Sequence, residues 1–222
     1  MTVKDINKVY VISLPNSDRK QAVKHELNNN FIWFNWYDGI ENKGNGAEGL
    51  KQTFKKLFTE CLEKNVSNVM VFEDDAMFVC QKGYEEIGKV LADVPEDYHM
   101  VKFGANLLCP VSKVTDNLNR ILMSYALHAC LYSNEGMKLI LESIDKTDEP
   151  IDVIIAKYIE PLGSCYVSSK MLVTQRPTKS SIFEYDPIKH KGLGELYEVD
   201  NGIIRWDKLM QQQWVNNTKH LK

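Results

Sequence analysis

The 222-residue sequence has no long apolar run and no cysteine spacing typical of a metal site. No apolar stretch reaches the roughly 20 residues that a membrane-spanning helix needs, and the first residues contain no apolar core of a signal peptide. The five cysteines form no Cys-x-x-Cys pair, and most lie in apolar segments, where a reduced thiol acts as a small hydrophobic side chain. We therefore expect a soluble protein of a reducing, cytoplasmic compartment, without a zinc site.

The chain also lacks an excess of basic residues. Its formal net charge is −3, which gives no support to a surface built for nucleic acid, although a local basic groove would be compatible with it. Internal repeats and low-complexity tracts are absent too. With 44% hydrophobic and 26% charged residues, the chain is long enough for one substantial globular domain with its own core.

Short apolar runs alternate with amphipathic segments along the first half of the chain. They predict strands at residues 9–14, 31–37, 69–73 and 98–103, and helices at about 19–27, 50–62 and 84–91. Residues 40–49 contain three glycines and few apolar residues, which predicts a loop.

The second half is less regular. Its patterns predict extended chain at residues 121–132, helices at 137–144, 150–156 and about 206–215, and strands at 165–167 and 171–173. The alternation along the whole chain favours an open α/β sheet with helices on its faces.

The most unusual segment is the run of three carboxylates, Glu73, Asp74 and Asp75, which directly follows apolar strand residues. Like charges at the end of a buried strand are costly unless something positive lies among them. Mg²⁺ and Mn²⁺ prefer carboxylate oxygens and leave other positions to water and substrate phosphates. On an extended segment, Glu73 and Asp75 point to the same side, so we expect both at a metal and Asp74 behind them. The alternative is a solvated acidic turn that closes a strand.

The motifs occur in an order that resembles glycosyltransferase family 25, the family of lipooligosaccharide sugar transferases and collagen galactosyltransferases. The similarity covers roughly residues 8–183 as a series of short matches. These matches are Val11-Ile12-Ser13-Leu14 with Asp18-Arg19, Tyr37-Asp38-Gly39, Val71-Phe72-Glu73-Asp74-Asp75, Leu127-His128-Ala129-Cys130-Leu131-Tyr132-Ser133 with Gly136, Pro150-Ile151-Asp152, and Gln175-Arg176-Pro177 with Ser180-Ser181-Ile182.

The resemblance implies a GT-A fold, which is a Rossmann-like open mixed sheet, mostly parallel, with helices on both faces. It also implies a nucleotide-sugar donor, a UDP-sugar in the first place, with Mn²⁺ or Mg²⁺ bridging the diphosphate. One departure is that family members carry a serine-histidine pair in the helix before the acidic strand, where this chain has Thr53-Phe54. The last forty residues match no motif of the family. We therefore expect a transferase domain at residues 1–185 and a C-terminal extension at 186–222 that could cover the active site.

Ligands of open α/β sheets bind beyond the carboxyl ends of the strands, and several polar residues are expected there. Asp18 and Arg19 follow the first strand, and Arg19 could pair with a donor phosphate; a capping aspartate beside a surface arginine is the alternative. A basic, hydroxylated loop could also bind the diphosphate, or be an ordinary exposed turn; its donor-binding candidates are Arg176, Ser180 and Ser181.

Two further residues are candidates for contacts with the reacting groups. Asp152 follows a proline at a helix start and is our candidate for the base that removes the proton of the acceptor hydroxyl. The alternative is an acid that merely complements the helix dipole. His128 lies in an apolar run, which suits a substrate contact or a hydrogen-bonded core histidine.

Together, the residues and the resemblance predict a metal-dependent glycosyltransferase that moves a hexose or pentose from a nucleoside diphosphate sugar to an acceptor hydroxyl, with inversion. The expected acceptor is a glycan, with a hydroxymethylated base in phage DNA or a protein side chain as less common alternatives. A catalytically silent carbohydrate- or partner-binding domain of the same fold is a rival. So is a metal-dependent nucleotidyltransferase, but its glycine-rich phosphate loop is missing from residues 15–19. The sequence leaves the oligomeric state open.

Overall fold

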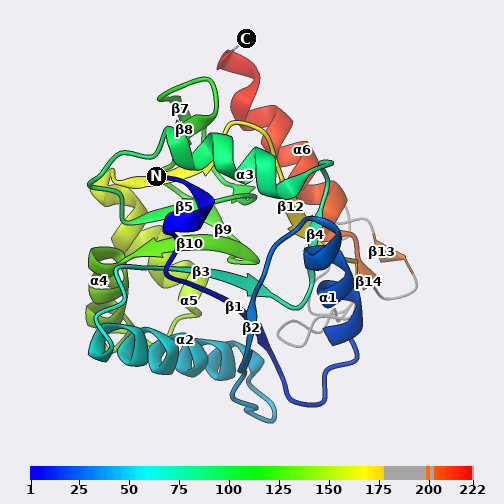
Figure 1. The fold of residues 1–222 in the computed structure, drawn as a ribbon, viewed down its shortest axis with the longest axis vertical. Coiled ribbons are helices and arrows are strands. Elements are labelled where there is room, and N and C mark those ends of the chain that lie inside the picture. The colour runs from blue at the N-terminus through cyan, green and yellow to red at the C-terminus, as the bar shows by residue number, and fades with distance from the viewer. Residues whose placement is uncertain (178–198, 201–202, 222) are drawn as a thin grey trace.

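The computed structural model describes residues 1–177, 199–200 and 203–221 (Figure 1). An eight-stranded sheet runs through the molecule in the order β2-β1-β3-β10-β5-β11-β8-β7. Six of these strands run in one direction, while β10 and β8 run against their neighbours. The strands are β1 (Lys8–Ser13), β2 (Asn35–Asp38), β3 (Asn68–Glu73), β5 (Met100–Lys102), β7 (Ser112–Lys113), β8 (Leu118–Arg120), β10 (Ala129–Ser133) and β11 (Cys165–Ser168).

Three antiparallel strand pairs lie outside this sheet. They join β4 (Ala76–Phe78) to β12 (Val173–Gln175), β6 (Asn106–Leu107) to β9 (Ser124–Tyr125), and β13 (Val199–Asp200) to β14 (Ile203–Ile204). The helices are α1 (Lys20–Asn29), α2 (Gly46–Glu63), α3 (Gly83–Ala92), α4 (Asn134–Ile144), α5 (Ile151–Ile154) and α6 (Trp206–Thr218). A π-helical turn (Ile155–Ile159) and a short 3-10 helix (Glu160–Leu162) continue the α5 segment.

Helices cover both faces of the central sheet (Figure 1). Because side chains alternate along a strand, Val69 and Val71 of β3 join one core cluster with α2, α4 and α5, while Met70 and Phe72 join the other with α1 and α3. The predicted fold class, an open and mostly parallel α/β sheet with helices on both faces, is therefore confirmed.

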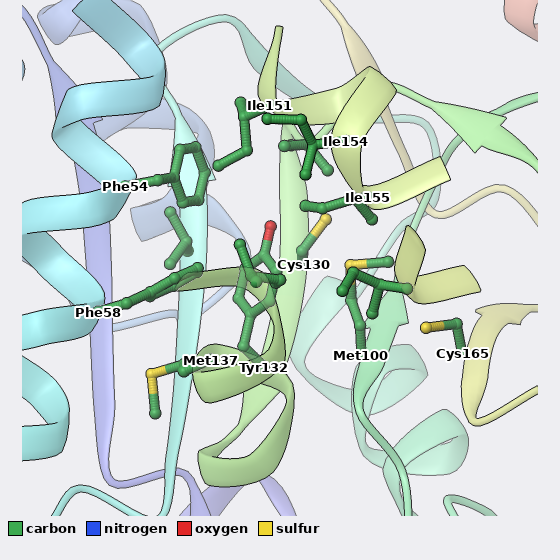
Figure 2. Close-up of a cluster of buried hydrophobic side chains, with 14 of the residues drawn as sticks. Phe54, Phe58, Met100, Cys130, Tyr132, Met137, Ile151, Ile154, Ile155 and Cys165 are labelled. Carbon is green, nitrogen blue, oxygen red and sulfur yellow. The ribbon is translucent and has the colours of Figure 1, made fainter. Parts of the chain in front are cut away.

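Figure 2 shows the core on the α2 side of the sheet. The ring of Tyr132 on β10 packs against Phe58 and Phe54 of α2, with ring centroids 4.9 and 6.0 Å apart. Ile151 and Ile154 of α5 belong to the same buried cluster. The start of α5 is thus fixed to the sheet by apolar burial, which is the dominant stabilising term in a core of this kind.

Several element boundaries differ from the predictions. The strand expected at residues 31–37 begins only at Asn35, since Phe31 adopts a left-handed φ of 57°. The loop expected at residues 40–49 ends earlier, because α2 begins at Gly46. The side chain of Asn45 caps this helix by accepting a hydrogen bond from the backbone N of Glu48 (3.1 Å).

The strands β4, β6, β7 and β8 were not predicted. Each contains two or three residues, which is too short for a sequence pattern, and pairing with distant chain creates them. The C-terminal helix α6 buries Leu209, Met210 and Trp214, and Trp214 joins the α2-side core. The expected domain boundary near residue 185 lies outside the described residues. In the part of the chain that the structure describes, no helix is both long and apolar enough to cross a membrane.

Candidate active site

A pocket of about 310 Å³ opens where β1, β2 and β3 end. Its lining includes all three carboxylates of the acidic triplet, together with Arg19 and Gln175. Most of residues 39–46, which connect β2 to α2, form the opposite wall. The pocket lies at the carboxyl ends of parallel strands, where open α/β sheets bind their ligands, and its volume is at the small end for ligand sites.

The acidic triplet is not a single extended segment. Glu73 ends β3, Asp74 and Asp75 form a turn, and the chain then leaves the central sheet as β4, which pairs with β12. Strict alternation was predicted for an extended segment, and it does not apply beyond Glu73 because Asp74 and Asp75 lie in a turn. All three carboxylates line the same pocket.

Asp74 is buried and fully engaged by its neighbours. Its Oδ1 pairs with Arg19 Nη2 at 2.9 Å, and its Oδ2 accepts hydrogen bonds from the hydroxyls of Ser13 and Ser17, both at 2.7 Å. These contacts tie the loop between β1 and α1 to the acidic turn. They also hold the guanidinium of Arg19 at the pocket wall.

Asp75 is much less completely paired. Its Oδ2 accepts a 3.3 Å hydrogen bond from Gln175 and lies 3.9 Å from Arg19 Nη1. Its Oδ1 is buried and has no hydrogen-bond partner among the described residues. Burial raises the pKa of Asp75 to about 6, with the charge of Asp74 adding to the shift and Arg19 opposing it.

Glu73 is in a similar position. Burial raises its pKa well above the usual value, and the charges of Asp75, Asp74 and Asp152 raise it further. Two neighbouring carboxyls whose pKa values are raised, mainly by burial, lie at this pocket, and perturbations of this kind cluster at functional sites.

The donor set of this pocket suits a hard divalent cation. Glu73 and Asp75 offer carboxylate oxygens, and the unpartnered Oδ1 of Asp75 is an available ligand atom. The described residues contain no group of three or more His, Cys, Asp or Glu side chains that could hold a metal ion. The protein would therefore provide one or two ligands, and water and the phosphates of a bound ligand would complete the coordination, as is usual for Mg²⁺.

The wall formed by residues 39–46 is anchored to both β1 and α2. The backbone N of Gly39 donates to the carbonyl of Ser13 (2.8 Å), and that of Ile40 donates to Thr53 Oγ1 (2.8 Å). A Cβ on Gly49 would lie 2.5 Å from the carbonyl oxygen of Ile40, so this close approach requires glycine. Thr53, the first residue of the Thr53-Phe54 pair, thus anchors the wall and lines the pocket.

A loop was predicted at residues 40–49, and most of residues 39–46 line the pocket. The glycines between a strand and a helix were the available signal for a ligand-lining segment. Ser17 was missed as well, and Ser13 and Gln175, which belong to the quoted motifs, were given no role of their own. Hydroxyl and amide side chains of this kind carry no spacing signal, and the fold alone brings them to the acidic turn.

Arg176 stabilises the acidic turn from outside the pocket. Its guanidinium pairs with Glu26 of α1 (3.1 Å), and its backbone N donates to the carbonyl of Asp75 (2.6 Å). The side chain does not line the pocket, and neither does the exposed Asp18. The other two residues of the expected diphosphate loop, Ser180 and Ser181, lie outside the described residues.

His128 is fully buried next to the end of β3, and it does not line the pocket. Its Nε2 donates to the carbonyl of Val173 (3.0 Å), and its own carbonyl accepts from the backbone N of Glu73 (3.0 Å). Burial lowers the pKa of His128 to about 4, so the ring is neutral near pH 7. These contacts are those of the core histidine that the sequence left as one alternative.

Asp152 is the half-buried second residue of the α5 segment. It does not line the pocket, but its charge acts on Glu73 and contributes to the raised pKa of that group. Burial raises the pKa of Asp152, while the positive charge of Lys102 opposes the shift. The structure therefore gathers Arg19, Glu73, Asp74 and Asp75 in one pocket and places Asp152 within electrostatic reach of it.

No family model matches the sequence, and no curated protein matches it. Among solved structures, the chain is similar to A197 from STIV (14% identity, 75% of this chain and 83% of that one, TM-score 0.45). It is also similar to a glycosyltransferase involved in glycosylation of the major capsid of PBCV-1 (9% identity, 72% and 80%, TM-score 0.48). A third is an apo UDP-glucose pyrophosphorylase (8% identity, 69% and 62%, TM-score 0.41).

At this level, likeness concerns the path of the chain and does not identify the reaction. The neighbours include enzymes of glycosyl transfer and of nucleotide-sugar synthesis. The resemblance to glycosyltransferase family 25 stays a prediction.

Proposed function

We propose that the protein is a metal-dependent glycosyltransferase that uses a nucleoside diphosphate sugar, a UDP-sugar in the first place, and acts with inversion. The observation that supports this best is the pocket beyond β1 and β3, where Asp75 keeps a buried, unpartnered carboxylate oxygen beside Arg19. A cation bound to Asp75 and Glu73 and a phosphate facing Arg19 would balance these charges. A GT-A fold of the family 25 kind is part of the proposal.

A bound Mn²⁺ or Mg²⁺ would neutralise the charge that develops on the leaving diphosphate. The chain's own residues have separate tasks. Glu73 and Asp75 hold the ion, while the guanidinium of Arg19, fixed by Asp74, faces the donor phosphates. The wall of residues 39–46 encloses the donor and excludes water from one side.

Asp152 acts as the base in this proposal. Its carboxylate takes the proton of the acceptor hydroxyl as the hydroxyl oxygen attacks the anomeric carbon. The bond from that carbon to the diphosphate breaks, and the nucleoside diphosphate leaves with the electron pair. A single displacement of this kind inverts the anomeric configuration. The acceptor is a glycan in the first place.

Donor binding and donor hydrolysis test the proposal without knowledge of the acceptor. Purified protein is screened by thermal shift against UDP-, GDP- and CMP-sugars, each with and without Mn²⁺, because specific binding stabilises the folded state by mass action. We expect one nucleotide sugar to raise the melting temperature only when Mn²⁺ is present, and to be hydrolysed slowly.

Three results would contradict the proposal in different ways. If no nucleotide sugar binds or is hydrolysed and Asp75→Asn changes nothing, the transferase function fails. Metal-dependent binding without hydrolysis or transfer would favour the catalytically silent binding domain. Formation of a nucleotide sugar from a nucleoside triphosphate and a sugar phosphate would favour the nucleotidyltransferase.

A further inference from the structure

A closed network of charged and polar side chains lies inside the core on the α5 side of the sheet. Lys102 of β5 and Glu160 are both fully buried, and Lys102 Nζ lies 2.9 Å from Glu160 Oε1. Ser124 joins them, since Lys102 Nζ donates to its Oγ (3.0 Å) and this hydroxyl donates to Glu160 Oε1 (2.7 Å). We call Lys102, Ser124 and Glu160 the buried triad.

A buried ion pair is seldom needed for stability, because desolvation of the two charges offsets their attraction. Apolar residues of similar size would fill the same space. The second carboxylate oxygen of Glu160 is buried without a hydrogen-bond partner among the described residues, which adds to the cost. The stability of the core therefore does not explain why these three polar residues are present.

One of its members lies close to the segment of Asp152 in space. Ser124 belongs to β9, which packs against α5, and it lies two residues before Ala126. Ala126 has a φ of 71°, a left-handed conformation that alanine rarely adopts and that the surrounding structure must impose. The anchored hydroxyl of Ser124 and the β6–β9 pairing supply that constraint.

Glu160 holds the other end of the segment that carries Asp152. The helical run from Asp152 to Glu160 contains the π-helical turn, and such turns are frequent at functional sites. The third member, Lys102, places a positive charge within reach of Asp152 itself. The triad thus acts on Asp152 from the strand, from the preceding loop and from its own helix.

We propose that the buried triad positions Asp152 for proton transfer, by holding in place β9 and the helical segment that carries Asp152. This inference rests on the proposed function, in which Asp152 is the base. Lys102, Ser124 and Glu160 are positioning residues, since none of them lines the pocket.

The experiment replaces the ion pair as a unit. In Lys102→Met/Glu160→Leu both charges are removed together, so no unpaired charge stays in the core, and we expect the protein to fold. We expect its Mn²⁺-dependent thermal shift with the donor, and its donor KM, to equal those of the wild type. We expect kcat for donor hydrolysis to fall about 10- to 100-fold, the effect of a misplaced catalytic group.

The matched control is Glu135→Leu/Lys138→Met, which removes an exposed pair of the same residue types on α4. It should change neither kcat nor KM. Ser124→Ala should lower kcat in the same direction as the double variant, and Ser124→Thr, which keeps the hydroxyl, should restore it. If the double variant does not fold, the comparison of Ser124→Ala with Ser124→Thr tests the positioning role.

A double variant or Ser124→Ala that folds and keeps a wild-type kcat would overturn the positioning role. A parallel loss of donor binding and kcat would do the same, since it would show a general structural defect. If the wild type itself neither binds nor hydrolyses a nucleotide sugar, the proposed function fails, and the positioning of a base fails with it.

Discussion

Two buried clusters of charged side chains among the described residues differ in their charge balance. The triad of Lys102, Ser124 and Glu160 pairs one positive with one negative charge and is sealed from solvent. The lining of the pocket has more acidic than basic side chains, namely Glu41, Glu73, Asp74 and Asp75 against Arg19 and Lys43.

The difference separates two uses of buried charge. A balanced, closed pair can hold backbone segments in place, since each charge has its partner within the protein. An unbalanced cluster at a pocket raises the pKa values of its own carboxyls and lacks a cation. In the proposed function, a cation bound from outside would balance this cluster.

The largest expected change in the free energy of unfolding comes from removing one of the two charges of the buried triad. Lys102→Met leaves the Glu160 carboxylate buried without its partner, which should lower the free energy of unfolding by about 3–5 kcal/mol. Urea unfolding followed by circular dichroism measures it. The control Lys138→Met removes an exposed lysine and should cost less than about 1 kcal/mol. A small loss for Lys102→Met would mean that water or another group compensates Glu160.

The opposite result is expected in the unbalanced cluster. Asp75→Asn removes a negative charge from a site that has too many, so the free energy of unfolding near pH 7 should stay equal or rise. Donor hydrolysis with Mn²⁺ should fall by about 100-fold or more, as when a charge-stabilising group of a catalytic site is lost. The control is Asp116→Asn, a substitution of an exposed aspartate beside β7. Retained hydrolysis in Asp75→Asn would exclude Asp75 as a metal ligand.

The raised pKa of Asp75 also predicts how stability depends on pH. Between about pH 4 and 6 the folded chain holds a proton on this carboxyl that the unfolded chain has released. Stability should therefore fall by about 3 kcal/mol as pH rises through this window, and the cost should be fully present above pH 6. The difference between wild-type and Asp75→Asn melting curves at pH 5 and 7.5 isolates the effect. A pH-independent difference would contradict it.

The pocket wall gives a smaller, steric test. Gly49→Ala places a Cβ against the carbonyl of Ile40, and we expect a loss of about 1–2 kcal/mol in unfolding free energy together with weaker donor binding. The matched substitution Gly88→Ala lies on α3, where the nearest atom to the new Cβ, on the side chain of Val3, is 3.8 Å away. It should stabilise by about 0.5–1 kcal/mol, because alanine favours helix. Equal changes in unfolding free energy for Gly49→Ala and Gly88→Ala would mean that the wall moves away from the new Cβ without cost.

The smallest change in stability is expected for the hydrogen bonds between Asp74 and the loop after β1. Ser17→Ala removes one of two hydroxyl donors, while Ser13 and Arg19 keep the carboxylate paired, so the loss should be about 1 kcal/mol. Thermal unfolding beside the exposed-site control Ser112→Ala measures it. A much larger loss would show that Ser17 alone holds the loop.

Much of the fold was predictable from local patterns. The apolar run before Glu73 identified β3, and the periodic apolar residues of residues 50–62 identified α2, because both elements bury a large face of their own. The boundaries near Asn35 and Gly46 were missed. They depend on a left-handed residue and a side-chain cap, which weigh little in a hydrophobic pattern.

The candidate site was predictable only in part. The acidic triplet and Arg19 could be recognised by residue type, and the structure brings them together. The direction of Asp74 could not, because the turn depends on the pairing of β4 with β12, about a hundred residues apart in the chain. Lys102 in a strand pattern was a signal too, yet its partners Ser124 and Glu160 come from separate segments.

The sequence by itself determined which segments are strands and helices, and where acidic residues meet the end of a buried strand, since burial and charge are properties of neighbouring residues. The tertiary structure decided which charges are paired. It gave Asp74 its arginine, left Asp75 with an unpartnered oxygen and enclosed Lys102 with Glu160. The physical reason is that the free energy of a buried charge depends on groups within a few ångströms, and the fold draws these groups from distant parts of the chain.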